Sequence, residues 1–112
     1  MLVDDSRDDA ELTMIELRSA GIDADFMRAD SEASLLAALD RSMPHLVLSD
    51  LNMPGFDGPH ALSIVREHAP DARFVFLTGA LEDDAVLPSA DGVLLKHELH
   101  ELPALVRKLL GA

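Results

Sequence analysis

Short apolar runs alternate with longer amphipathic stretches along the whole chain. The apolar runs, bounded by polar and turn-forming residues, predict strands at residues 2–3, 24–29, 45–49, 73–77 and 92–95. Between them, apolar residues at helical spacing predict helices at residues 6–20, 31–40, 59–68 and 82–88, the last of these short. A final helix carries Leu102, Leu105, Val106 and Leu109.

This alternation predicts an α/β fold, with a parallel sheet covered by helices on both faces and connected by right-handed crossovers. Local signals support the boundaries of the helices. Ser6 and Ser31 are favoured N-caps, and Gly21 suits the end of the first helix. Pro59 and Pro103 fit first turns, where a missing N–H costs little. At 112 residues, the chain is expected to form one domain over residues 1–112.

Composition narrows the classes of function. With 48% hydrophobic and 27% charged residues, the chain has enough apolar material for a packed core. The absence of cysteine excludes disulfides, thiol nucleophiles and cysteine-bound metals. A formal net charge of −12 argues against nucleic acid as a partner. No apolar run is long enough for a membrane span and no signal peptide is evident, so we expect a cytoplasmic protein with no membrane partner.

Polar residues follow four of the predicted strands. Asp4 and Asp5 come after the first strand and Asp50 after the third. Thr78 and Lys96 come after the last two. Because ligands of open α/β sheets bind at the carboxyl ends of the strands, these side chains are candidates for one site.

The chemistry of these residue types indicates a phosphoryl site. Neighbouring carboxylates raise one another's pKa, and a divalent cation such as Mg²⁺ relieves that repulsion. Asp5 and Asp50 are expected as direct ligands of the cation, with Asp4 acting through water. The Lys96 ammonium and the Thr78 hydroxyl suit phosphate oxygens. One aspartate is then available as a nucleophile.

Four segments together resemble the receiver domains of two-component response regulators. They are LVDD at 2–5, LVLSDLNMPGFDG at 46–58, FLTGA at 76–80 and LLK at 94–96. The resemblance covers essentially the whole chain, and the second segment is its most specific part. It implies a flavodoxin-like three-layer fold with a five-stranded parallel sheet of order 2-1-3-4-5.

The resemblance also implies a metal site and a phosphoryl acceptor. Asp50 would accept a phosphoryl group from a phosphohistidine on a histidine kinase or a phosphotransfer protein. Asp5, Asp50 and the backbone carbonyl of Asn52 would hold Mg²⁺, and Asp4 would hold one of its waters. The protein would be a phosphoryl acceptor rather than a classical enzyme, with room for autophosphatase activity.

Switching would follow from the same site. Thr78 would move toward the acyl phosphate, Lys96 would pair with it, and the domain would change its affinity for a protein effector or for a second copy of itself. The receiver would act alone, in the manner of a chemotaxis-type single-domain regulator, or as one part of a longer regulator.

Three features depart from the family pattern. Val93 occupies the position of a usual aromatic residue that changes rotamer together with the threonine. His97 stands where a proline usually follows the lysine. The stretch from Thr78 to Lys96 is about four residues short, roughly one helical turn, so the helix at 82–88 is expected to be stunted.

Other interpretations remain open for single residues. Asp4 and Asp5 also suit a helix cap, Asp50 a turn, Thr78 a strand-end hydroxyl and Lys96 a solvated position. Two further groups of residues are expected to have local roles only: Asp57 in an Asx-type turn, and His97 and His100 as solvated or capping residues.

Two alternatives exist for the function as a whole. One is a degenerate receiver that acts as an interaction module independent of phosphorylation, which Val93 and the short helix favour. The other is an aspartyl-phosphate phosphatase of the haloacid dehalogenase type. That class needs an Asp-x-Asp motif after its first strand, and here the two acids at 4–5 are adjacent.

Overall fold

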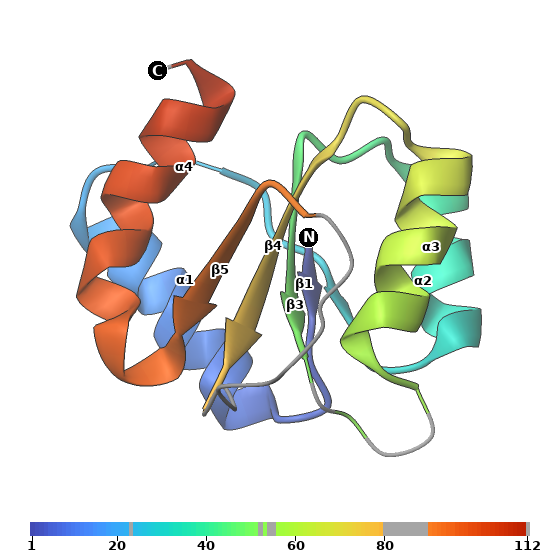
Figure 1. The fold of residues 1–112 in the computed structure, drawn as a ribbon, viewed down its shortest axis with the longest axis horizontal. Coiled ribbons are helices and arrows are strands. Elements are labelled where there is room, and N and C mark those ends of the chain that lie inside the picture. Colours follow the sequence, from blue (N-terminus) through green and yellow to red (C-terminus); the bar gives the residue numbers. More distant parts are fainter. Residues whose placement is uncertain (23, 52, 54–55, 80–89, 112) are drawn as a thin grey trace.

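A five-stranded parallel sheet forms the centre of the molecule, with strand order β2-β1-β3-β4-β5 (Figure 1). The structure is a computed structural model that describes residues 1–22, 24–51, 53, 56–79 and 90–111. The strands are β1 (Leu2–Val3), β2 (Arg28–Ala29), β3 (Leu46–Asp50), β4 (Arg73–Thr78) and β5 (Gly92–Leu95). The predicted order 2-1-3-4-5 is confirmed.

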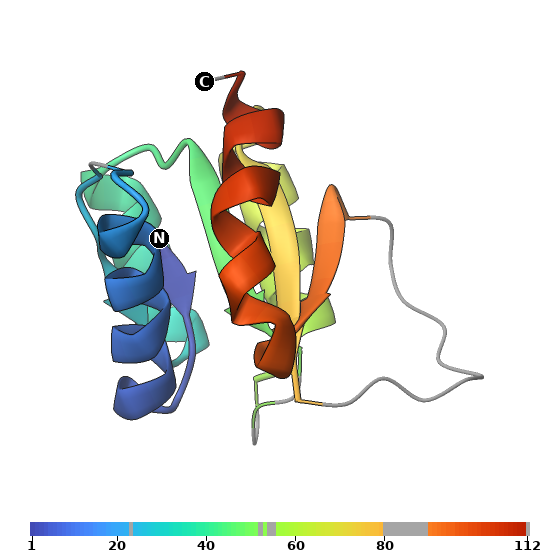
Figure 2. The same cartoon turned by 90° about the vertical axis from the view of Figure 1, so that its left-hand side faces the viewer.

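Helices cover both faces of this sheet and give three layers. They are α1 (Arg7–Ser19), α2 (Glu32–Arg41), α3 (Gly58–His68), α4 (Leu102–Leu110) and a 3₁₀ helix, η1 (Lys96–Glu101). Helices α1 and α4 lie on one side of the sheet and α2 and α3 on the other (Figure 1). Figure 2 looks onto the side that carries α1 and α4. This arrangement confirms the predicted flavodoxin-like fold.

Two apolar cores fill the spaces between these layers, because successive strand residues point to opposite faces. Val47 and Phe74 belong to the core beneath α2 and α3. Their neighbours Leu48 and Val75 belong to the core beneath α1 and α4. All four are buried, which explains why the central strands are continuously apolar in sequence.

The predicted caps are present. The side chain of Ser6 accepts a hydrogen bond from the backbone N–H of Asp9, and Ser31 caps α2 in the same way. Gly21 has a φ of 82°, as expected for a residue that ends a helix. Asp57 accepts from the N–H of His60 and is the N-cap of α3, consistent with its expected local role.

The structure corrects three expectations about element boundaries. The strand predicted at 24–29 is only Arg28–Ala29, because its partner β1 offers just two residues for pairing. Strands β3 and β4 end on Asp50 and Thr78, so these polar residues are the last of their strands rather than the first of the following loops. The 3₁₀ helix η1 was not predicted.

The departures from the family pattern concern the far end of the sheet. Val93 is 41% exposed on β5. No cis peptide bond occurs in the described residues, so the bond between Lys96 and His97 is trans. The short helix predicted at 82–88 lies outside the described residues. Within the described ranges, every helix is too short or too polar to span a bilayer.

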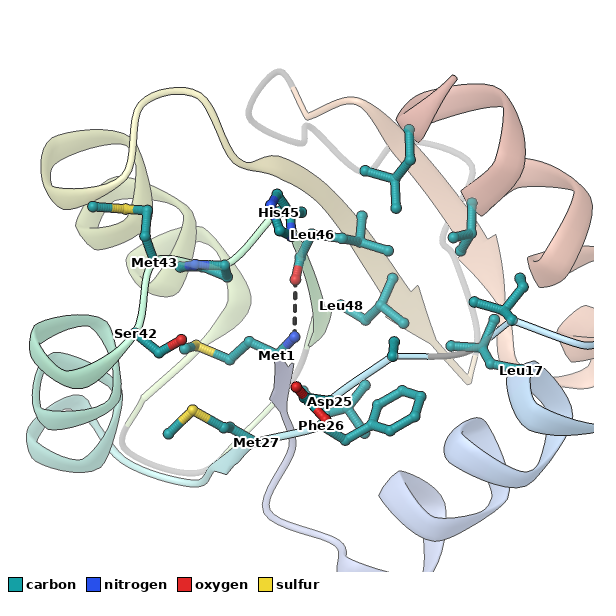
Figure 3. A pocket seen from close by; sticks show the side chains of 16 residues that line it. Met1, Leu17, Asp25, Phe26, Met27, Ser42, Met43, His45, Leu46 and Leu48 are labelled. Atoms are coloured by element: carbon teal, nitrogen blue, oxygen red, sulfur yellow. Dashed lines mark hydrogen bonds between the residues drawn. The ribbon is translucent and has the colours of Figure 1, made fainter. Parts of the chain in front are cut away.

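A pocket of about 530 Å³ opens where the strands begin, with a largely apolar lining that includes Leu17, Phe26 and Met43 (Figure 3). The amino group of Met1 lies in it and donates a 2.9 Å hydrogen bond to the carbonyl of Leu46. Burial lowers the pKa of the Met1 ammonium to about 6. This pocket lies at the amino-terminal end of the strands, opposite the carboxyl-terminal end that carries the acidic residues.

Candidate functional site

The strands β1, β3, β4 and β5 run in the same direction, so their carboxyl ends lie together at one end of the sheet (Figure 1). Carboxylate oxygens of Asp4, Asp5 and Asp50 lie within 4.8 Å of one another there. Thr78 pairs in register with Leu95, the residue before Lys96. All five residues predicted from the strand ends therefore lie at this carboxyl-terminal end of the sheet.

The environments of the three carboxylates differ. Asp4 is 5% exposed and Asp50 is 9% exposed, whereas Asp5 is open to solvent. The N–H of Ser6 donates a 2.9 Å hydrogen bond to Oδ1 of Asp4 and fixes its orientation. The cluster thus has two oriented, nearly buried acids and one that solvent can reach.

Burial raises the pKa of Asp4 above its ordinary value. The backbone hydrogen bond from Ser6 and the charge of Lys96 oppose this rise, while the charges of Asp50 and Asp9 add to it. The predicted mutual effect of the carboxylates is therefore present at Asp4, although loss of water contributes more than repulsion does.

This donor set fits a divalent hard cation. Mg²⁺ prefers oxygen ligands and keeps several waters, and the carboxylates of Asp4, Asp5 and Asp50 converge closely enough to share one ion. Positive charge here would also offset the cost of burying Asp4. The remaining predicted ligand, Asn52, lies outside the described residues.

Lys96 contacts several of these acids. Its Nζ lies 3.4 Å from Oδ2 of Asp50 and 3.6 Å from Oδ2 of Asp4. Its shortest contact, at 2.7 Å, is with Oδ2 of Asp9. Burial acts to lower the pKa of Lys96, but the hydrogen bond that Lys96 donates to Asp9 and the charges of Asp4, Asp50 and Asp9 outweigh it, so this pKa is raised. The ammonium therefore stays charged at neutral pH.

Two residues near the site were missed by the sequence reasoning. Asp9 was not among the predicted site residues, but its carboxylate pairs with Lys96. Arg28, the first residue of β2, donates a 3.0 Å hydrogen bond to the backbone carbonyl of Asp4. Neither contact has a local sequence signal, because each depends on how a helix or an edge strand packs beside β1.

Other polar groups complete the surroundings of Asp50. Thr78 is fully buried at the end of β4, and Ser49 donates a 3.0 Å hydrogen bond to the carbonyl of Asp50. His97 and His100 are exposed on η1, and neither belongs to a metal-ligating group among the described residues. Their expected solvated positions agree with the structure.

Comparison with known proteins identifies the class. Residues 1–107 match the family model described as the response regulator receiver domain. The chain belongs to this family. The match confirms the resemblance seen in the sequence and assigns the domain to two-component signalling.

Two named regulators are similar to the chain. It is 35% identical over 78 residues to the response regulator protein FleR of Pseudomonas aeruginosa, a match that covers 70% of this chain and 16% of FleR. It is 29% identical over 66 residues to the transcriptional regulatory protein YhcZ of Bacillus subtilis, covering 59% of this chain and 31% of YhcZ. The chain thus covers less than a third of either relative.

Solved structures show the same architecture. Response regulator TrrA of Thermotoga maritima, in complex with Mg²⁺ and BeF, is 30% identical with a TM-score of 0.81, and the match covers 97% of this chain and 96% of TrrA. The receiver domain of AraT from Geobacillus stearothermophilus is 23% identical with a TM-score of 0.73, covering 98% and 92%. The second likeness concerns the fold alone.

Proposed function

We propose that Asp50 accepts a phosphoryl group from a phosphohistidine on a histidine kinase or phosphotransfer protein, with Mg²⁺ held by Asp4, Asp5 and Asp50. The observation that carries this proposal is the convergence of these carboxylates within 4.8 Å, with the Lys96 ammonium 3.4 Å from Asp50. The Mg²⁺–BeF complex of TrrA supports it by likeness.

In the proposed transfer, a carboxylate oxygen of Asp50 forms a bond to phosphorus as the phosphorus–nitrogen bond of the donor breaks. The product is an acyl phosphate, and the electron pair of the broken bond stays on the imidazole nitrogen. Bound Mg²⁺ would supply positive charge for the phosphoryl oxygens. Asp4 and Asp5 would hold that charge beside Asp50, and Asn52 would add its backbone carbonyl.

Lys96 and Thr78 are proposed to bind the phosphoryl oxygens of the acyl phosphate. The compact ammonium of Lys96 can pair with a phosphoryl oxygen once a carboxylate oxygen of Asp50 is bonded to phosphorus and the negative charge lies on the phosphoryl oxygens. The Thr78 hydroxyl can donate to another oxygen. Thr78 ends β4, which lies beside β3, and Lys96 directly follows β5, which lies beside β4. Small shifts of these two residues can therefore alter the surface around β4 and β5.

The output is proposed to be a change in contacts with a downstream protein effector or with a second copy of the chain. We place this exchange in the cytoplasm, without nucleic acid or membrane as the direct partner of residues 1–112. Hydrolysis of the acyl phosphate by the domain itself would reset the switch. We do not assign a classical enzyme activity to it.

One observation favours a second candidate, a receiver that binds its partner independently of phosphorylation. Val93 is exposed on β5 at the position where the family usually has an aromatic residue, so the usual coupling to Thr78 is missing or follows another route. This candidate predicts partner binding that Asp50→Asn leaves unchanged.

Exposure of the protein to a small phosphodonor with Mg²⁺ separates the two candidates. Intact-mass spectrometry should show one labile phosphoryl adduct that Asp50→Asn abolishes and that removal of Mg²⁺ prevents. An Asp57→Asn variant is a matched control, because it removes a carboxylate from the N-cap of α3 and should keep the adduct. An unlabelled wild-type protein would favour the phosphorylation-independent candidate.

A further inference from the structure

Asp9 is an acid that the proposed phosphoryl chemistry does not use, yet it makes the shortest contact of Lys96. The distance from Lys96 Nζ to Asp9 Oδ2 is 2.7 Å, against 3.4 Å to Asp50 Oδ2. The first is a charge-assisted hydrogen bond of ordinary length, and the second is at the outer limit of hydrogen bonding. The ammonium is therefore closer to Asp9 than to the proposed acceptor.

The backbone of Asp9 is fixed on two sides. Its N–H donates to the side chain of Ser6, the N-cap of α1, and its carbonyl accepts a 3.0 Å hydrogen bond from the Thr13 hydroxyl. The first turn of α1 thus holds the Asp9 carboxylate beside the end of β5. The Asp9 side chain is 42% exposed, compared with 11% for Asp50, so its attraction draws Lys96 toward the rim of the site.

We propose that Asp9 is a positioning residue that competes with the phosphoryl group for Lys96 and so opposes the phosphorylated form. This inference rests on the proposed function of Asp50. The effect acts through one contact: Asp9 holds the ammonium that the phosphoryl oxygens need, so the ammonium must leave Asp9 before it can pair with them.

Asp8 provides a matched control for a purely structural role of Asp9. Both acids lie in the first turn of α1, where a negative charge favours the helix dipole. Asp8 is exposed and makes no ion pair within the described part of the chain. An effect through the helix should therefore appear in Asp8→Asn and Asp9→Asn alike, whereas competition for Lys96 should appear only in Asp9→Asn.

Titration calorimetry of beryllium fluoride binding to the full chain at saturating Mg²⁺ tests the inference. The quantity compared is the dissociation constant of beryllium fluoride. Asp9→Asn should bind about two- to fivefold more tightly than wild type, the range expected from a partly exposed ion pair. Asp8→Asn should match wild type. In a Lys96→Gln background the gain from Asp9→Asn should disappear, since the two residues act through one contact.

Several results would overturn the inference. Equal affinities of Asp8→Asn and Asp9→Asn, weaker binding by Asp9→Asn, or a gain that persists without Lys96 would each do so. A wild-type protein that does not bind beryllium fluoride would instead contradict the proposed function. The nitrogen resonance of the Lys96 ammonium in the metal-free protein then tests the pair separately: Asp9→Asn should shift it, and no shift would overturn the contact itself.

Discussion

At the scale of single residues, Lys96 allows metal binding and phosphoryl binding to be separated. Lys96→Ala should weaken the conformational response to phosphorylation, because the phosphoryl oxygens lose their ammonium partner. Mg²⁺ binding should be kept or become tighter, because the substitution removes the Lys96 ammonium that contacts Asp4 and Asp50. Mg²⁺ titration by NMR, with and without phosphodonor, measures both effects; loss of Mg²⁺ binding would contradict the role of Lys96.

The buried amino group of Met1 should make stability depend on pH. Its pKa falls from 8.0 to about 6 on folding, so the unfolded chain binds more protons between these values and stability rises as pH increases through this window. For a chain that begins at Met1, the contribution is up to about 2–3 kcal/mol.

Denaturant unfolding of free and N-acetylated protein isolates the contribution of the Met1 amino group to stability, because acetylation removes the titrating amine while the histidines remain. The difference in unfolding free energy between the two forms should change between pH 6 and pH 8. A constant difference would show that folding does not lower the pKa of the Met1 amino group.

The site residues differ in how well the sequence predicts them. Asp4, Asp50 and Lys96 were predictable because each stands directly at the end of an apolar strand, and the topology of a parallel sheet brings such ends together. Asp9 was not predictable as a partner of Lys96. Its contact depends on the angle at which α1 packs against the sheet, which no local pattern encodes.

At the scale of elements, the close approach of α3 to the end of β3 depends on Gly58. A Cβ at this position would lie 2.8 Å from the Asp50 carbonyl oxygen, 2.9 Å from Leu51 Cα and 2.9 Å from Phe76 Cε1. Two of these atoms are backbone, so Gly58→Ala must displace either α3 or the strand end that carries Asp50. We expect a loss of about 1–3 kcal/mol in unfolding free energy, together with weaker Mg²⁺ binding.

Gly79→Ala is the matched control for Gly58→Ala. It lies next to Thr78 at the same edge of the sheet, but a Cβ there meets no atom within 4 Å. Urea unfolding should therefore give Gly79→Ala a stability close to that of wild type. Similar losses in both variants would mean that the approach of α3 is not the reason for the glycine at position 58.

The elements themselves were largely predictable, and the exceptions have a common cause. Helix starts followed from capping residues such as Ser6 and Ser31, and strands β3, β4 and β5 followed from their apolar runs. The length of β2 was wrong because an edge strand extends only as far as its partner, and β1 pairs over two residues. The 3₁₀ helix η1 likewise depends on how the chain turns from β5 into α4.

At the scale of the whole molecule, Mg²⁺ should stabilise the fold, because the acidic cluster exists only when β1 and β3 lie side by side. At free Mg²⁺ about 100-fold above its dissociation constant, the gain is about 2.7 kcal/mol. Thermal unfolding with and without Mg²⁺ measures it. Asp5→Asn removes an exposed ligand, leaves both cores intact and should abolish most of the gain; an equal gain in this variant would contradict the metal assignment.

The proposed switch depends first on which residue the phosphoryl group attaches to. Borohydride reduction of protein treated with phosphodonor and Mg²⁺ converts an aspartyl phosphate to homoserine, which peptide mass spectrometry can locate. The predicted result is homoserine in place of Asp50, with Asp4, Asp5 and Asp9 unchanged. Homoserine at one of those other acids, or at none, would contradict Asp50 as the acceptor.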